Sequence, residues 1–234
     1  MDRHRSFATL LLATMLIISM TPFSQALNQT EGVNLIILEL RDGSRQLAIL
    51  ATPQQDDSMT NPDYKLLPYH WPTTAEYWIN PSNKYGFSSS ALIVVLKASA
   101  ETWDKETSYA VFSYKGTTSK DAGKRDGYNV VSFGRYQANA IAVTYIWYNK
   151  ITLTIVETDT KLNTRYRWSL NGEQGKMDVQ NIMTHEFGHW CGLDDLYSDV
   201  DYWLTMYGYA DYGETYKRTL GLGDILGLEA VYGP

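Results

Sequence analysis

The run from His185 to Asp195, HEFGHWCGLDD, constrains the fold of this chain more than any other feature. On an α-helix, residues four apart lie on one face, so His185 and His189 can offer two imidazoles to one metal ion while Glu186 projects beside them. Gly192 has no Cβ and readily adopts the left-handed backbone that ends a helix, which lets the chain turn back sharply. The run therefore predicts a helix, a glycine turn and a third metal ligand at Asp195.

The simplest alternative is a surface helix that carries two histidines and a glutamate by chance. For an isolated HExxH this alternative is a serious competitor, but the continuation through Gly192 to Asp195 weakens it. The chain has only four histidines, and half of them lie in this run. Asp194 is adjacent to the candidate third ligand, and only the spacing after Gly192 favours Asp195. Cys191 is interpreted as a small buried hydrophobe, not as a ligand.

The extended run resembles the zinc-binding sequence of the metzincin clan of zinc endopeptidases. The usual third ligand of that clan is histidine, and the aspartate at position 195 is similar to the one in snapalysin. Residues 205–208, TMYG, resemble the Met-turn, and Leu220–Gly233 resembles the C-terminal helix of matrixins, the family of the matrix metalloproteases. Weaker similarities to secreted bacterial and archaeal matrixin-like peptidases lie at residues 101–104, 126–133 and 178–186.

The resemblance covers roughly residues 63–234 and implies an α+β fold. A metzincin (zincin-like) catalytic domain has a mixed twisted β-sheet, two long helices including the zinc helix, and a C-terminal helix in a small lower subdomain. A cleft between the subdomains would hold one zinc ion and admit an extended peptide. The candidate edge strand for pairing with that peptide is Ile141–Trp147.

The implied activity is that of a secreted zinc-dependent endopeptidase acting on protein or peptide substrates. His185, His189 and Asp195 would bind the zinc ion, which lowers the pKa of its bound water toward about 7. Glu186 would act as general base in the attack on the peptide carbonyl and then as general acid toward the leaving amine. Met206 would form a hydrophobic floor beneath the imidazoles.

Aromatic residues gather around the Met-turn, where the family builds its main specificity pocket. Some of them are expected to line that pocket and to favour apolar or aromatic substrate side chains. The pocket candidates are Tyr202, Trp203, Tyr207 and Tyr209.

Two other classes of function remain open. The chain could be a catalytically inactive secreted module that keeps zinc for stability, although the intact Glu186 argues against this. It could also be a zinc hydrolase that acts on a non-peptide bond. Structural calcium is a further candidate cofactor at a loop that carries Asp121, Asp126 or Asp159, where the alternative is ordinary solvation.

The N-terminus has the pattern of a signal peptide. Arg3 and Arg5 supply positive charge, Phe7–Met20 is apolar, and small residues around Ala26 predict cleavage after it. The apolar stretch falls short of the ~20 residues that span a bilayer, so secretion is favoured over an uncleaved anchor and no stable membrane association is expected. The net charge of -6 and the lack of a basic stripe argue against nucleic-acid binding. The mature protein is expected to be a monomer.

Residues 27–62 are interpreted as an N-terminal extension that precedes a catalytic domain at 63–234. Val33–Leu40 and Gln46–Ala51 read as strands of a hairpin joined around Asp42-Gly43. The hairpin is either a prosegment that blocks the cleft or an extra element of the sheet. Thr52–Pro72 is rich in Pro, Asp, Asn and Gln, which suits a linker or a strap across the domain surface.

Within the catalytic domain, three helices and one mixed sheet are predicted. The first helix is capped by Ser88 or Ser89 and runs to about Lys105, the zinc helix follows an N-cap at Asp178 and runs to about Cys191, and the last spans about Leu222–Tyr232. The predicted strands are Glu76–Asn80, Ala110–Tyr114, Val130–Phe133, Ile141–Trp147 and Ile151–Glu157.

Overall fold

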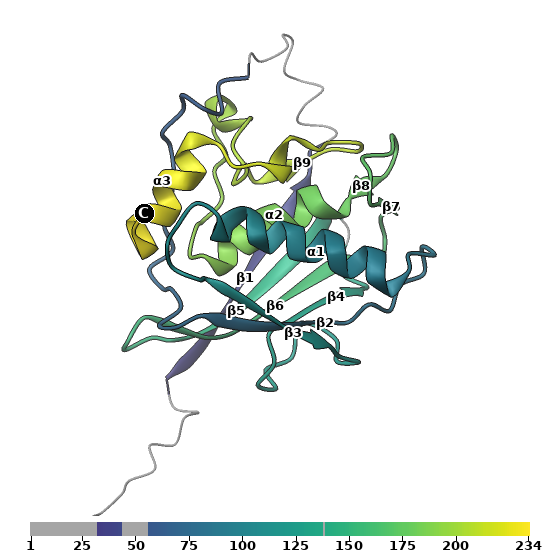
Figure 1. The fold of residues 1–234 in the computed structure, drawn as a ribbon, viewed down its shortest axis with the longest axis horizontal. Helices are drawn as coiled ribbons and strands as arrows, with labels where there is room; N and C mark the ends of the chain where they lie inside the picture. The colour runs from purple at the N-terminus through teal and green to yellow at the C-terminus, as the bar shows by residue number, and fades with distance from the viewer. Residues whose placement is uncertain (1–31, 44–55, 138) are drawn as a thin grey trace, which may run out of the picture. The chain divides into compact units, whose positions relative to one another are not determined.

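The computed structural model describes residues 32–43, 56–137 and 139–234 (Figure 1). The predicted signal peptide at residues 1–26 and the predicted strand Gln46–Ala51 lie outside these ranges. Within them, no helix has both the length and the apolar character needed to cross a bilayer.

In these ranges, seven strands form one mixed sheet in the order β3-β2-β4-β6-β5-β1-β9. Strand β5 runs antiparallel to both of its neighbours, β6 and β1, while the other paired strands are parallel. A separate two-stranded sheet pairs β7 with β8. The strands are β1 Val33–Asp42, β2 Ala75–Ile79, β3 Phe112–Thr117, β4 Val130–Gly134, β5 Ala140–Asn149, β6 Thr154–Asn163, β7 Trp168–Ser169, β8 Met177–Asp178 and β9 Tyr209–Ala210.

Three α-helices of the described part of the chain accompany the sheet, and α1 and α2 pack against each other over one of its faces (Figure 1). The described residues thus have an α+β fold with a mixed sheet, which confirms this part of the predicted fold. The helices are α1 Ser89–Asp104, α2 Val179–Trp190 and α3 Leu222–Tyr232, and two 3₁₀ turns lie at Asp199–Asp201 and Tyr216–Arg218.

The predicted helix ends are confirmed because the capping side chains make the expected bonds. The hydroxyl of Ser88 accepts the N–H of Ala91 at 3.2 Å, and Asp178 Oδ1 accepts the N–H of Asn181 at 3.0 Å. Each cap satisfies one of the N–H groups that the first turn of a helix leaves without a partner.

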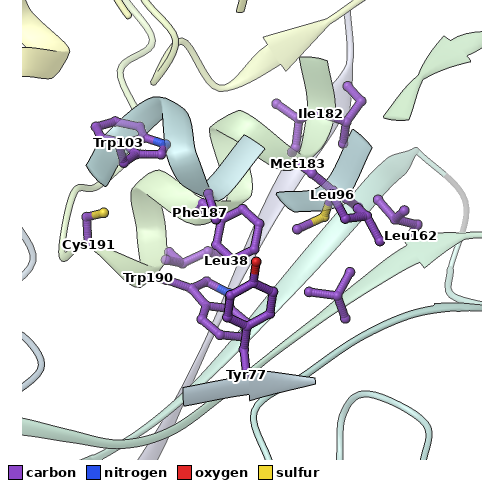
Figure 2. Close-up of a cluster of buried hydrophobic side chains, with 14 of the residues drawn as sticks. Leu38, Tyr77, Leu96, Trp103, Leu162, Ile182, Met183, Phe187, Trp190 and Cys191 are labelled. Atoms are coloured by element: carbon purple, nitrogen blue, oxygen red, sulfur yellow. The ribbon is translucent and has the colours of Figure 1, made fainter. Parts of the chain in front are cut away.

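The main core lies between the sheet and the two packed helices (Figure 2). Phe187 and Trp190 of α2 contact Tyr77 of β2, with ring centroids 5.4 and 6.3 Å apart. Trp103 of α1 is fully buried and donates its indole N–H to the carbonyl of Thr184 at 2.8 Å. Helix α2, the candidate zinc helix, is therefore packed between the aromatic residues and α1. This packing fixes the position of the remaining face of α2.

The predicted strand Ile151–Glu157 is wrong at its start. Residues 150–153 form a turn, and β6 runs instead from Thr154 to Asn163. The carboxamide oxygen of Asn149 accepts the N–H groups of Ile151 and Thr152, at 2.8 and 3.1 Å. This local turn outweighs the β-propensity of the isoleucine. The predicted strand Ala110–Tyr114 is also shifted, because β3 runs from Phe112 to Thr117. Asp104 accepts the N–H groups of Val111 and Phe112 at its start.

The prediction that Ile141–Trp147 is an edge strand is also wrong. These residues lie in β5, and β1 pairs with β5 from Val33 opposite Asn149 to Arg41 opposite Ala140. The alternation of the segment indicated a half-buried strand but carried no information on which neighbours it has. The neighbour comes from the predicted strand Val33–Leu40 of the N-terminal extension, for which the sequence analysis had left open a place in the sheet.

Candidate metal centre

Three buried ligand atoms converge between α2 and the loop that follows it. One ligand atom each of His185, His189 and Asp195 lies within 4.8 Å of the others, and Asp195 Oδ1 is 3.2 Å from His185 Nε2 and 3.6 Å from His189 Nε2. All three atoms are buried without a hydrogen-bond partner. Unpaired buried polar atoms are costly, and one cation would satisfy all three. The set can therefore hold a metal ion.

The two imidazoles are oriented by backbone carbonyls. His185 Nδ1 lies 2.7 Å from the oxygen of Thr205, and His189 Nδ1 lies 2.9 Å from the oxygen of Leu193. A carbonyl oxygen only accepts, so each Nδ1 carries the proton and each Nε2 presents a lone pair to the shared position. Burial lowers the pKa of His185, which favours the neutral form that a metal requires.

Asp195 is held as a carboxylate. Burial alone raises its pKa, but the nearby His189 and His185 and the hydrogen bond from Tyr197 bring the pKa of Asp195 below its ordinary value. The hydroxyl of Tyr197 donates to Asp195 Oδ2 at 3.0 Å, which leaves Oδ1 turned toward the imidazoles. Tyr197 was not predicted in this role, and its spacing two residues after the ligand is the only signal in the sequence.

Gly192 makes the turn that brings Asp195 back to the helix. Its φ is +95°, in the left-handed region, and the next N–H returns to the carbonyl of Gly188 at 3.0 Å. The segment that precedes β2 then pairs with this turn: Leu67 donates to the oxygen of Gly192, and Asp194 donates to the oxygen of Lys65, both at 2.8 Å. The predicted strap at residues 52–72 thus stabilises the ligand loop in its described part, residues 56–72.

Asp194 points away from the metal centre. Its carboxylate forms an ion pair of 2.6 Å with the ammonium group of Lys65 at the surface. Spacing alone had favoured Asp195 over Asp194, and Asp195 is the one that joins the two histidines.

Glu186 is fully buried next to the ligands and is held at one oxygen. Its Oε2 accepts a hydrogen bond of 2.5 Å from the hydroxyl of Thr144 on β5, while Oε1 has no partner. Burial raises the pKa of Glu186 to about 7. Thr144 could not be predicted, because it lies 42 positions before Glu186 and only the packing of β5 under α2 joins them.

Met206 lies directly beneath the helix that carries the histidines. A Cβ on Gly188 would clash with the Met206 sulfur. The sulfur can therefore lie against the helix only because residue 188 is a glycine. The turn is fixed from α3: Asp224 accepts the N–H groups of Thr205 and Met206 at 2.8 and 3.0 Å. The carbonyl of Thr205 in turn orients His185.

The aromatic residues predicted for the pocket lie on both sides of Met206 in the sequence, and their rings contact one another. Tyr202 contacts the rings of Trp203 and Tyr207, and Tyr209 contacts the rings of Tyr207 and Tyr197. A residue that the sequence analysis missed lies among them. Lys217 is completely buried, with its Nζ 3.4 Å from Glu214 Oε1 and 4.5 Å from the centre of the Tyr216 ring.

The three aspartates named as calcium candidates each make contacts of their own within the described residues. The carboxylate of Asp159 accepts the N–H groups of Gly123, Lys124 and Val130. Asp126 pairs with Lys120 at 2.7 Å. Asp121 lies near the carboxamide of Asn80, at 3.3 Å, so the three aspartates do not form a common ligand cluster in the part of the chain that the structure describes.

Comparison with known proteins does not assign a function to this site. No family model matches the chain, and no curated protein matches it. The assignment of the centre therefore depends on its geometry and donor chemistry alone.

Proposed function

We propose that this chain is a secreted zinc-dependent endopeptidase with a metzincin-like, matrixin-like catalytic domain. The observation that carries the proposal is the convergence of three unpartnered ligand atoms, from His185, His189 and Asp195, beside the buried carboxylate of Glu186. A metal site built for stability alone has no need of a buried carboxylate next to its ligands. A site for hydrolysis needs one as a proton carrier.

The donor set favours zinc. Two neutral imidazoles and one carboxylate are typical ligands of catalytic Zn²⁺, and three protein ligands leave one position open. Zinc, when bound, lowers the pKa of a water ligand and polarises the carbonyl of the substrate. The Thr205 and Leu193 carbonyls act here as positioning groups, because they hold both Nε2 lone pairs toward one point.

Glu186 is proposed as the group that moves the proton. Its Oε1 is free to accept the proton of the attacking water, while Thr144 holds Oε2 in place. The same carboxyl then delivers that proton to the leaving amine, so one residue acts first as base and then as acid. The burial that raises the pKa of Glu186 suits this double role, since a carrier works best when its pKa lies near the working pH.

The substrate is proposed to be an extended peptide. Its backbone would pair with a sheet edge, and one side chain would enter a pocket built near the aromatic residues Tyr202, Trp203, Tyr207 and Tyr209. These rings favour apolar or aromatic partners. The sheet would form the upper subdomain and the segment with α3 the lower one.

The test measures zinc content and peptide cleavage on the same preparations of full-length protein. Wild type, Glu186→Gln and Asp194→Asn are compared on a peptide library followed over hours. Glu186→Gln is expected to keep its zinc and lose about 10²- to 10⁴-fold in cleavage rate. Asp194→Asn is the matched control, because it removes a carboxylate next to the ligands that, among the described residues, binds Lys65 and the N–H of Asp195.

Two results would contradict the proposal. Cleavage by Glu186→Gln at the wild-type rate would exclude Glu186 as the proton carrier. A zinc-loaded protein that hydrolyses esters but no peptide would place the chain among hydrolases of another bond.

A further inference from the structure

Strand β1 lies along the sheet edge that borders the metal centre. It is antiparallel to β5 over nearly the whole length of both strands (Figure 1). Leu38 of β1 lies opposite Thr144 of β5, the residue that holds Glu186. Strand β1 therefore occupies the edge of β5 nearest the proposed general base, and no further chain can pair with β5 there.

The end of β1 reaches the other side of the centre. Arg41 donates its N–H to the oxygen of Gly208 at 3.2 Å, and Arg41 and Asp42 pair in parallel with Tyr209 and Ala210 of β9. Gly208 adjoins the metal centre, since a Cβ added to it would lie 3.1 Å from Asp195 Oδ1. Strand β1 thus bridges the base side and the ligand side of the site.

The side chains of β1 fill the space beneath this bridge. Leu38 and Leu40 are 8% and 0% exposed and belong to the main core, whereas Leu35 and Ile37, on the other face, are 46% and 43% exposed. With β1 in place, the His185, Glu186 and His189 side chains have no exposed surface. A peptide cannot reach them in this arrangement.

A peptide that adds to a sheet edge needs free backbone groups on that edge and room for alternate side chains. Along β5, strand β1 already pairs with the backbone groups and fills the space for side chains with its own. On the opposite side, Arg41 of β1 binds the Gly208 oxygen, and Gly43, directly after β1, donates to the Ala210 oxygen at 2.9 Å. The two walls that an extended substrate would contact are both bonded to this chain's own strand.

We propose that β1 occupies the substrate groove as an intramolecular substrate mimic, and that a peptide must displace it to be cleaved. This inference rests on the proposed endopeptidase function and deepens it. It also defines the substrate class: an extended segment with aliphatic side chains two positions apart, in the places of Leu38 and Leu40. Turnover is set by the fraction of molecules in which β1 has left the groove.

The first experiment locks β1 in place with a disulfide in the full chain. Ile37 and Tyr145 are direct cross-strand partners, and the Cα separation of such pairs, about 4.5 to 5.5 Å, lies in the range that a disulfide spans. Native Cys191 is buried, so mild reductant acts on the engineered pair. Ile37→Cys/Tyr145→Cys is compared with each single cysteine variant, which controls for the loss of the tyrosine and isoleucine side chains.

Two rates are measured for oxidised and reduced protein: peptide cleavage and the extraction of zinc by a chelator. Oxidation is expected to abolish cleavage and to slow zinc extraction severalfold, with reduction restoring both. Equal rates in the two states would overturn the inference while leaving the endopeptidase function intact. Because zinc extraction needs no catalysis, it still tests the position of β1 if no peptide is cleaved in either state, which is the outcome that would sink the proposed function.

The second experiment loosens β1. Arg41→Pro removes the N–H that binds the Gly208 oxygen, whereas Arg41→Ala keeps it and removes the same exposed side chain. The loss of one hydrogen bond is expected to make Arg41→Pro faster than Arg41→Ala by about 2- to 10-fold in peptide cleavage. A proline variant that is equally folded and equally slow would mean that β1 is a permanent part of the sheet.

Discussion

Thr144 and Glu186 are joined by a hydrogen bond of 2.5 Å that ends a directed chain of donors. The indole N–H of Trp190 donates to the hydroxyl of Thr160 at 2.8 Å, and the Thr160 and Thr144 hydroxyls lie 2.6 Å apart. An indole only donates and a carboxylate only accepts, so the direction runs from Trp190 through both threonines to Glu186. The proposed proton carrier is thus positioned by two strands and its own helix.

Replacing Thr144 with valine tests this positioning. Thr144→Val keeps the shape of the side chain and removes the hydroxyl, so zinc content is expected to stay and kcat to fall about tenfold, the worth of one hydrogen bond to a charged group. Burial raises the pKa of Glu186 and the Thr144 bond opposes that rise. The acidic limb of the kcat/KM profile is therefore expected to move to higher pH, because the bond that favours the charged form is lost.

Thr158 provides the matched control on β6. Its hydroxyl is buried and, among the described residues, has no hydrogen-bond partner. Thr158→Val is expected to leave both kcat and the pH profile unchanged. If Thr144→Val and Thr158→Val behave alike, the hydroxyl of Thr144 has no positioning role.

The Tyr197 hydroxyl is expected to tune metal affinity through Asp195. Tyr197→Phe removes the donor to Asp195 Oδ2 and should weaken zinc binding by about 10- to 100-fold, the usual effect of losing such a supporting bond. The measurement is competition for zinc against a chelator of known affinity. Tyr212→Phe is the control, because that ring packs beside Tyr166, away from the metal ligands. Equal zinc affinity in the two variants would remove Tyr197 from the centre.

The part of this site formed by residues that are close together in the sequence could be predicted. His185, Glu186, His189 and Asp195 lie within a single helix and its following turn, where spacing fixes direction. Gly192 supplies the left-handed turn that the prediction required. The helix bounds were predictable for a related reason, since a capping side chain lies within three residues of the N–H that it binds.

The supports from distant parts of the chain could not be predicted. Thr144 and Asp224 reach the site only through tertiary packing, and nothing in their local sequence marks them. The neighbours of β5 also escaped prediction, because an alternating strand looks the same at an edge and beside β1. Lys217 was missed because a buried lysine among tyrosines depends on the pairing with Glu214, which the folded chain alone creates.

Asp224 is expected to be the most costly carboxylate to replace in α3. Its two oxygens accept the N–H groups of Thr205, Met206 and Gly221. Asparagine offers only one acceptor oxygen, so Asp224→Asn should leave a buried N–H unpaired and lower the free energy of unfolding by about 1 to 3 kcal/mol. Urea denaturation in a Glu186→Gln background, which prevents self-digestion, measures the change.

Glu229 lies in the same helix and is the control for that substitution. Within the described residues its side chain makes no hydrogen bond or ion pair, so Glu229→Gln is expected to unfold at the wild-type urea concentration. A loss of stability in Glu229→Gln that equals the loss in Asp224→Asn would mean that helix charge, not the bonds to the Met206 turn, decides the effect.

Asp159 is expected to make the protein less stable as the pH rises. Burial raises the pKa of this carboxyl to about 7, despite the N–H bonds from Val130, Gly123 and Lys124 that oppose the rise. The folded state therefore holds a proton that the unfolded state, with an ordinary pKa near 3.8, has lost, so stability falls as the pH rises from about 4 to about 7 and then levels off. Between pH 5 and pH 8 this contribution is on the order of 2 kcal/mol in the free energy of unfolding. Asp159→Asn should remove it, whereas the exposed Asp126→Asn should keep it. Urea denaturation at the two pH values decides, since an unchanged pH dependence in Asp159→Asn would mean that the buried carboxyl is ionised throughout.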